Sequence, residues 1–232
     1  MGLTKAQREE ILKQKLASMK QIEKKLHEEG YSFIAGIDEV GRGPLAGPVY
    51  AACVVLPVDF NYTGIDDSKK LSEKKREELY EIITSNALAY GIGISDNHEI
   101  DEINILEATK VSMIRAFQNC NEKLKHLNIN FNDNKSYASI DYLLIDALKL
   151  DIEIPQRGII KGDSKSLSIA AASIIAKVER DRYMKEMDDI YPGYDFASNK
   201  GYGTKNHYMG LDEKGCCKIH RKSFLKKYEA NK

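Results

Sequence analysis

The sequence lacks an apolar segment long enough to cross a membrane, since the apolar stretch at residues 46–58 is interrupted by Pro48 and Pro57. Its N-terminus is highly charged and has no apolar core of a secretory signal. It has only four cysteines, and their spacing fits neither a disulfide framework nor a zinc site. We therefore expect a cytoplasmic protein with no membrane partner.

Several common catalytic motifs are also missing. There is no Walker A phosphate-binding loop, and the Gly-Arg-Gly at residues 41–43 is too short for a dinucleotide fingerprint. None of the five histidines has a metal-binding spacing, and no Ser-His-Asp or Cys-His arrangement is recognisable. These absences argue against an ATP-dependent phosphotransferase and against hydrolases that use zinc or a side-chain nucleophile.

Charge is distributed unevenly along the chain, although the formal net charge is zero. Residues 31–198 hold 19 Lys and Arg against 27 Asp and Glu, and residues 199–232 hold nine against three. An acidic centre with a basic C-terminus suits a metal-holding core beside a surface that binds polyanions. A basic tail that only keeps the protein in solution gives the same pattern, so charge alone leaves both interpretations open.

Hydrophobic periodicity predicts an α/β protein with a mixed five-stranded sheet flanked by helices. The strands are expected at residues 33–37, 49–56, 88–94, 142–145 and 157–161. The first two should be antiparallel neighbours. The helices are expected at residues 5–29, 73–86, 104–127 and 166–187, with a polar loop at 128–139. The serine at position 72 is the expected N-cap of the second helix.

Four acidic residues stand at the ends of predicted strands or just beyond them. Asp38 and Glu39 follow the first strand, Asp146 ends the fourth, and Asp163 comes after the fifth. Ligands of open α/β sheets gather outside the carboxyl ends of the strands, so we expect one shared carboxylate cluster. By residue type alone, a helix N-cap role for Asp163 and a turn role for Asp146 stay open.

Such a cluster predicts a metal site. Adjacent carboxylates repel each other, and a fold that brings them together usually holds a cation. Carboxylate oxygens suit Mg²⁺ or Mn²⁺ better than Zn²⁺. A pair of these ions is a common device for phosphodiester cleavage, in which one activates water and the other stabilises the leaving oxygen. Gly41 and Gly43 allow the turn that lets Asp38 and Glu39 serve one site.

Six ordered motifs resemble those of bacterial ribonuclease HII. They are GIDEVGRGPLAGP at 36–48, DSKKLS at 67–72, LID at 144–146, KGDSK at 161–165, IAAASIIAK at 169–177 and NKGYGT at 199–204. The resemblance runs from about residue 31 to residue 224, and its motifs are long and specific. Residues 1–30 lie outside it.

The resemblance implies a ribonuclease H-like fold and three regions. These are an N-terminal helical extension (1–30), a catalytic domain (31–195) and a C-terminal, basic, helical substrate-binding segment (196–232). The implied activity is cleavage of the RNA strand of RNA–DNA hybrids and of single ribonucleotides embedded in duplex DNA. Cleavage on the 5′ side of the ribonucleotide would leave a 3′-hydroxyl and a 5′-phosphate. The implied enzyme is a monomer that uses Mg²⁺ or Mn²⁺, with two ions in the substrate complex.

The resemblance also assigns roles to individual residues. The catalytic, metal-binding residues of the family correspond to Asp38, Glu39, Asp146 and Asp163. The element that reads the 2′-hydroxyl corresponds to Gly41, Arg42 and Gly43, and the junction-sensing tyrosine to Tyr202. Further substrate contacts are expected from Lys69, Lys70, Ser164 and Lys165. Candidate phosphate contacts in the basic tail are Lys200, Lys205, Lys218, Arg221 and Lys222.

Other interpretations stay open at this stage. Arg42 could simply pair with a neighbouring acid, Tyr202 could be an ordinary half-buried tyrosine, and each lysine could be a solvated surface residue. Ribonuclease HIII shares the chemistry but typically has lysine where Arg42 stands. A non-catalytic nucleic-acid binder could share the fold, although all four acids are present here. No role is predicted for residues 1–30 or for the adjacent Cys216 and Cys217.

Overall fold

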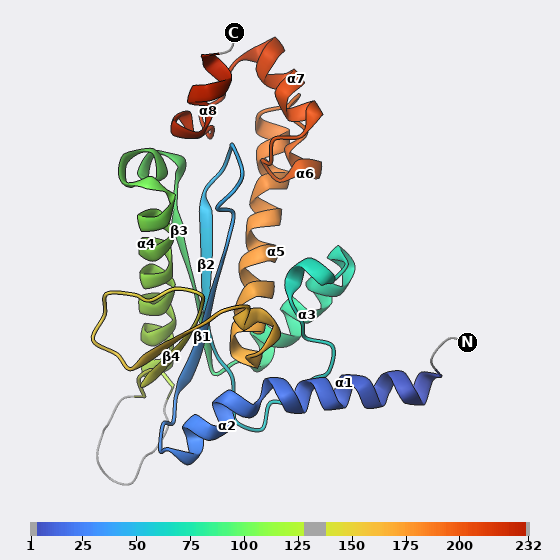
Figure 1. Ribbon diagram of the computed structural model, residues 1–232, viewed down its shortest axis with the longest axis vertical. Coiled ribbons are helices and arrows are strands. Elements are labelled where there is room, and N and C mark those ends of the chain that lie inside the picture. The colour runs from blue at the N-terminus through green and yellow to red at the C-terminus, as the bar shows by residue number, and fades with distance from the viewer. Residues whose placement is uncertain (1–3, 128–137, 231–232) are drawn as a thin grey trace.

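The computed structural model of the chain describes residues 4–127 and 138–230. Its strands form one mixed sheet in the order β3-β2-β1-β4-β5 (Figure 1). They are β1 (Ile34–Val40), β2 (Val49–Val55), β3 (Ala89–Ser95), β4 (Tyr142–Asp146) and β5 (Gln156–Ile159). β1 pairs antiparallel with β2 and parallel with β4. The predicted five-stranded sheet and its first antiparallel pair are therefore confirmed.

The helices lie on both sides of this sheet and at both of its ends. They are α1 (Lys5–Met19), α2 (Gln21–Glu28), α3 (Glu73–Asn86), α4 (Asn97–Lys125), α5 (Leu167–Ile190), α6 (Phe196–Asn199), α7 (Lys205–Lys214) and α8 (Lys222–Glu229). Short 3₁₀ turns occur at Ser68–Lys70 and Gly162–Ser164. Ser72 caps α3 as predicted, because its side chain accepts a hydrogen bond from the Lys75 N–H. No helix in the described ranges is both long and apolar enough to span a bilayer.

Helices α4 and α5 cover opposite faces of the sheet (Figure 1). The inner face of α5 is built from buried alanines, so this helix approaches the strands closely. A Cβ atom at Gly36 would lie only 2.1 Å from the carbonyl carbon of Ser168, so only glycine fits at that point of β1. The close approach fixes the start of α5 against the strand that carries Asp38.

The two terminal segments lie at opposite ends of α5 (Figure 1). α2 passes the end of the sheet at which α5 begins, and α1 continues outward from it. Helices α6 to α8 gather around the other end of α5, where Tyr194, Phe196 and Leu211 belong to a small core of their own. The β1–β2 loop reaches this C-terminal segment, because the Leu45 and Ala46 N–H groups donate to the Gly201 carbonyl.

Two of the predicted helices differ from the structure. The single helix expected at 5–29 is divided into α1 and α2 at Lys20. The helix expected to begin at Asn104 begins at Asn97, and Asn104 interrupts it with a φ of 69°. The Asn104 side chain accepts hydrogen bonds from two following N–H groups, so it acts as an N-cap in the middle of α4. Residues 128–137 of the expected loop lie outside the described residues.

Candidate active site

The first two acids lie on the central strand of the sheet. Asp38 and Glu39 are consecutive residues of β1, opposite Ala52 and Ala51 of β2. Asp38 is only 6 % exposed, and its Oδ1 accepts a hydrogen bond of 2.8 Å from the Glu39 N–H. On the other side of β1, Ile37 lies opposite the residue that precedes Asp146. The register of two neighbouring strands therefore places the acids at one edge of the sheet.

Asp146 and Asp163 are joined through the backbone that leads into α5. Asp146 is the last residue of β4, and its Oδ1 accepts a hydrogen bond of 2.7 Å from the Gly162 N–H. Asp163 follows in the 3₁₀ turn and is buried. A Cβ at Gly162 would lie 2.6 Å from the Ile169 side chain, so glycine permits this close contact. Ser166, not Asp163, caps α5 through a bond from the Ile169 N–H.

The pKa values of three of these carboxylates, Asp38, Glu39 and Asp163, are raised. Burial raises the pKa of Asp38 well above its usual range, and the charges of Glu39 and Asp146 add to the effect. Burial also raises the pKa of Glu39, against the opposing charge of Arg42. The pKa of Asp163 is raised by burial and then by Asp67 and Asp146. Asp38, Glu39 and Asp163 thus each feel the negative charge of neighbouring acids, which is the electrostatic condition that favours cation binding.

The negative charge of the Glu39 carboxylate is only partly compensated by the residues around it. Its Oε1 lies 3.3 Å from Nη1 of Arg42, whereas its Oε2 is buried and has no hydrogen-bond partner. A buried carboxylate oxygen without a partner is costly. Among the described residues, no group of three or more His, Cys, Asp or Glu side chains is already arranged to hold a metal ion. The all-oxygen donor set fits Mg²⁺ or Mn²⁺.

Of the four further predicted contacts, Lys69 is the one that the electrostatics link to the acids. Burial acts to lower the pKa of its ammonium, but attraction to Asp38, Asp163 and other acids outweighs burial and raises it. Lys70 lies 3.7–3.8 Å from Asp66 and Asp67 instead. The remaining two side chains, Ser164 and Lys165, take other positions: the Ser164 hydroxyl donates to the Lys161 carbonyl, and Lys165 is exposed.

Asp67 is a neighbour of the site that the sequence did not nominate. After burial, its negative charge is the largest cause of the raised pKa of Asp163. It also accepts the Lys69 N–H at 2.9 Å, which shapes the 3₁₀ turn that carries Lys69. Asp67 is the first residue of the motif at residues 67–72, so the sequence did contain it. It was not nominated because an aspartate ahead of a turn is ordinarily only a capping residue.

Two buried arginines hold the loop that follows Glu39. The Arg221 guanidinium donates to the carbonyls of Gly41, Arg42 and Gly47 at 2.6–3.0 Å. Arg180 donates to the carbonyls of Ala46, Pro48 and Lys200 at 2.9–3.2 Å. Both are 0 % exposed. The expectation that Arg221 contacts phosphate is therefore wrong, since its donors face the interior and are bound to loop carbonyls.

Tyr202 is 47 % exposed, and a buried pair of histidines fixes its backbone. A carbonyl can only accept, so His207 Nδ1 donates to the Tyr202 carbonyl at 2.9 Å. His207 Nε2 then accepts from His220 Nε2 at 2.9 Å, and His220 Nδ1 accepts the Cys217 N–H at 2.9 Å. Burial, followed by the charge of His207, lowers the pKa of His220 to about 4, which keeps the pair neutral. A Cβ at Gly43 would lie 3.3 Å from the Tyr202 ring.

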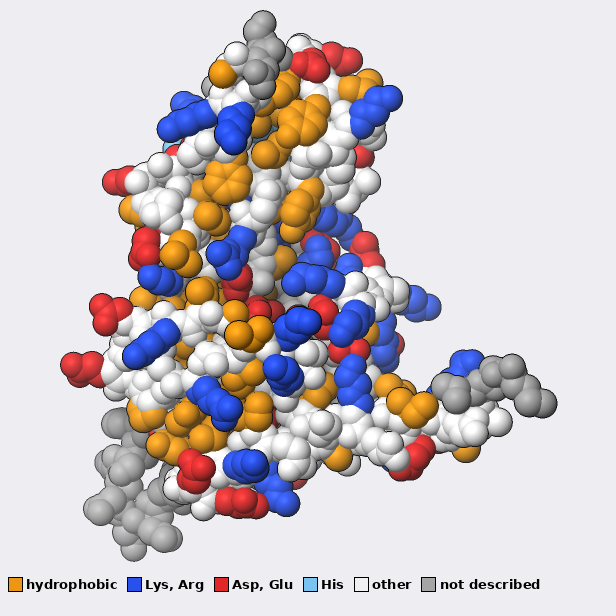
Figure 2. Space-filling model, viewed as in Figure 1, with side chains coloured by type: hydrophobic (Ala, Val, Ile, Leu, Met, Phe, Trp, Pro, Cys, Tyr) orange, Lys and Arg blue, Asp and Glu red, His pale blue; other side chains and the backbone are white. Residues whose placement is uncertain are grey.

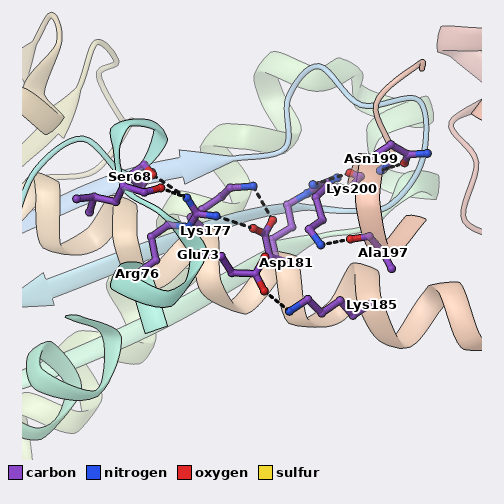
Figure 3. A network of polar contacts seen from close by, with 12 residues as sticks. Ser68, Glu73, Arg76, Lys177, Asp181, Lys185, Ala197, Asn199 and Lys200 are labelled. Carbon is purple, nitrogen blue, oxygen red and sulfur yellow. Dashed lines mark hydrogen bonds and ion pairs between the residues drawn. The ribbon is translucent and has the colours of Figure 1, made fainter. Parts of the chain in front are cut away.

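Positive charge gathers beside the site. Figure 2 shows Lys and Arg side chains across the middle of this face, over α3 and α5, with acids between them. Asp181 of α5 lies among three cations, Lys177, Arg76 and Lys200 (Figure 3). Lys177 is 2.6 Å away and Arg76 3.6 Å, and Lys200 donates to the Ala197 carbonyl. Burial lowers the pKa of Lys177 and of Lys200, although the charge of Asp181 opposes this effect in both.

The mixed sheet, the acids near the carboxyl ends of β1 and β4 and the helices on both faces are the arrangement that a ribonuclease H-type nuclease would have. The family profile of ribonuclease HII matches residues 35–227. A ribonuclease HII of Listeria monocytogenes is 52 % identical over 226 residues, which are 97 % of this chain and 80 % of that protein. The chain therefore belongs to the ribonuclease HII family and is a hydrolase, as the sequence motifs predicted.

Solved structures agree with this fold. The ribonuclease H2 of Pyrococcus horikoshii has a TM-score of 0.62 at 24 % identity, with 86 % of this chain and 98 % of that chain covered. Bst-RNase HIII in complex with Mn²⁺ has a TM-score of 0.59 at 18 % identity, covering 88 % of this chain and 71 % of that chain. Both likenesses concern the fold alone. The predicted ribonuclease H-like architecture is thus confirmed.

Proposed function

We propose that the protein is a metal-dependent endoribonuclease that cleaves the RNA strand of RNA–DNA hybrids and single ribonucleotides embedded in duplex DNA. Cleavage occurs on the 5′ side of the ribonucleotide and leaves a 3′-hydroxyl and a 5′-phosphate. The observation that carries the proposal is the cluster of mutually repelling carboxylates, in which Glu39 has a buried, unpartnered Oε2. Membership of a nuclease family supports a phosphodiester as the substrate of this cluster.

Asp38, Glu39, Asp146 and Asp163 are the proposed ligands of Mg²⁺ or Mn²⁺, with two ions in the substrate complex. When bound, these ions supply an activated water and stabilise charge on the leaving 3′-oxygen. The protein orients the ligands through strand register and through the Gly162–Asp146 hydrogen bond. Lys69, which is attracted to the same acids, is placed to contact the phosphate that the ions approach.

Ribonucleotide recognition is assigned to the loop Gly41–Gly43 and to Tyr202. A 2′-hydroxyl distinguishes RNA from DNA, and glycines allow main chain to approach a sugar closely. The exposed Tyr202 ring lies beside Gly43, so one ribose can meet both. Phosphate contacts are assigned to Arg42, Lys70, Ser164 and Lys165 and to the cations around Asp181.

We further assign three regions to the chain: the extension (1–30), the catalytic domain (31–195) and the basic segment (196–232). The proposed enzyme is monomeric and cytoplasmic.

One assay tests the proposal as a whole. A DNA duplex with one embedded ribonucleotide is incubated with the protein and Mg²⁺ or Mn²⁺, and the products are sized and their ends identified. We expect a single cut 5′ to the ribonucleotide, with a 3′-hydroxyl and a 5′-phosphate, and no cut when EDTA is present. Cleavage in EDTA, or a 2′,3′-cyclic phosphate product, contradicts the proposed chemistry.

Tyr202→Ala should impair cleavage at a single ribonucleotide more than it impairs binding to plain DNA. Packing of an aromatic side chain on a nucleotide is worth ~1–3 kcal/mol, so the loss in kcat/KM should be roughly tenfold or more. Tyr208→Ala is the matched control, since Tyr208 is another exposed tyrosine of the same segment. The reverse ranking, with DNA binding harmed more than cleavage, assigns Tyr202 a structural role.

A further inference from the structure

The geometry points to a function for the N-terminal extension, and we propose that its Glu23 is a positioning residue for Asp163. This inference rests on the proposed metal site. Residues 4–30 of the extension lie outside the range matched by the family profile, which begins at residue 35. Its helix α2 passes close to the start of α5 (Figure 1).

Glu23 holds the first turn of α5 with a single oxygen. Its Oε1 accepts from the Ser166 hydroxyl at 2.6 Å, the Ser168 N–H at 3.0 Å and the Ser168 hydroxyl at 2.8 Å. Both serines are buried. A carboxylate at a helix N-terminus is favoured by the helix dipole and by the unpaired N–H groups there. Glu23 therefore ties α2 to the residue that caps α5.

The same serine closes the turn that contains Asp163. The Ser166 N–H donates to the Gly162 carbonyl at 2.9 Å, and the Gly162 N–H donates to Asp146 at 2.7 Å. Asp163 therefore lies in a short turn that Asp146 holds on one side and the Glu23–Ser166 contact holds on the other. Such outer partners orient the residues that bind a metal.

A second anchor reaches Asp163 from the opposite direction. Lys15 of α1 forms an ion pair with Asp66, and Asp66 accepts the Asp67 N–H at 2.8 Å. Asp67 lies close enough to Asp163 for its negative charge to raise the pKa of that residue. The extension thus contacts both chain segments that enclose Asp163.

Polar anchors matter here because the extension is not packed continuously on the domain. Leu16, Met19 and Leu26 are buried, but a pocket of about 590 Å³ lies between the extension and the domain. The pocket is lined from both sides, by Glu23 of α2 and by Leu167 of α5 among others. Glu23 Oε2 is buried without a hydrogen-bond partner, so the contact is retained at a cost to stability. A positioning role explains why such a contact is kept.

The test measures binding of Mn²⁺ alone, by isothermal titration calorimetry of the full chain without nucleic acid. Glu23→Ala should weaken Mn²⁺ binding about tenfold, the lower end of the effect of losing an outer partner of a metal ligand. Lys15→Ala should weaken it in the same direction. Glu28→Ala is the matched control, since Glu28 lies exposed on the same helix, and it should bind Mn²⁺ like the parent. Duplex binding in EDTA should be unchanged in all three variants.

Parental Mn²⁺ affinity in folded Glu23→Ala and Lys15→Ala overturns the inference. If Glu23→Ala does not fold, Lys15→Ala decides by itself, and parental Mn²⁺ affinity in that variant also overturns the inference. Lower activity with unchanged Mn²⁺ affinity assigns Glu23 a purely structural role and likewise overturns it. A parent protein that binds no Mn²⁺ is a different result, since it contradicts the proposed function itself.

Discussion

Asp38→Asn should abolish cleavage and leave duplex binding largely intact. The substitution keeps the shape of a side chain that is only 6 % exposed and removes the charge that a metal ion needs. Several kcal/mol of transition-state stabilisation depend on the ion, and ~4 kcal/mol corresponds to about a thousandfold in rate. The cations that should contact phosphate, such as those around Asp181, are untouched.

The same variant should be more stable than the parent when no metal is present. Burial and the charges of Glu39 and Asp146 raise the pKa of Asp38, so at neutral pH its ionised form costs the folded state free energy. This cost is present above the folded-state pKa and disappears as the pH falls through it. An asparagine removes the cost at any pH, and we expect a higher Tm in EDTA at pH 7.

Thermal unfolding with and without Mn²⁺ separates these effects. Millimolar Mn²⁺ should raise the Tm of the parent, because an ion that binds only the folded state stabilises it, and should raise that of Asp38→Asn much less. Asp59→Asn, a change at an exposed aspartate, is the control and should behave like the parent in both assays. Equal turnover by Asp38→Asn and the parent, or a parental Tm unmoved by Mn²⁺, contradicts the metal site.

The acidic edge of the sheet could be predicted because its signals are local. Apolar runs followed by acids placed Asp38 and Asp146 near the ends of two neighbouring strands, and the rule for α/β sheets brought those ends together. The first strand was predicted too short, because β1 continues through Asp38 and Glu39 to Val40. The roles of these acids stay predictions, but their proximity follows from strand register. The place of Asp163 was harder to predict, since an aspartate ahead of a helix is typical of an N-cap. Only the fold shows that Ser166 is the N-cap of α5.

Interactions between distant segments could not be predicted in the same way. Asn104 has the sequence features of a helix start and does cap a helix, but α4 continues on its other side. Glu23 looks like one of many charged residues on a helix, and its contacts with Ser166 and Ser168 span more than 140 residues. Burial of a charged side chain depends on partners of this kind, which leave no periodic pattern in the chain.

Arg221 is the sharpest example, and Arg221→Lys should impair both the fold and the cleavage of single ribonucleotides. The guanidinium bonds three carbonyls of the β1–β2 loop from a fully buried position. Burial, then the charge of Arg180, lowers its pKa to about 9, and the hydrogen bonds of the guanidinium all go to the three carbonyls. A lysine presents a single ammonium and cannot reproduce the planar fork.

At least one loop carbonyl should then lose its partner, and each buried bond to a charged donor is worth ~1.5–3 kcal/mol. We expect a loss of roughly 2–4 kcal/mol, which lowers the Tm by about 5–15 °C for a chain of this size. Below the new Tm, kcat/KM at an embedded ribonucleotide should still fall, because Gly41 and Arg42 are no longer held in place. The exposed neighbour provides the control: Lys222→Ala should keep the parental Tm and change only the salt dependence of binding. Parental Tm and cleavage in Arg221→Lys contradict the view that this arginine shapes the recognition loop.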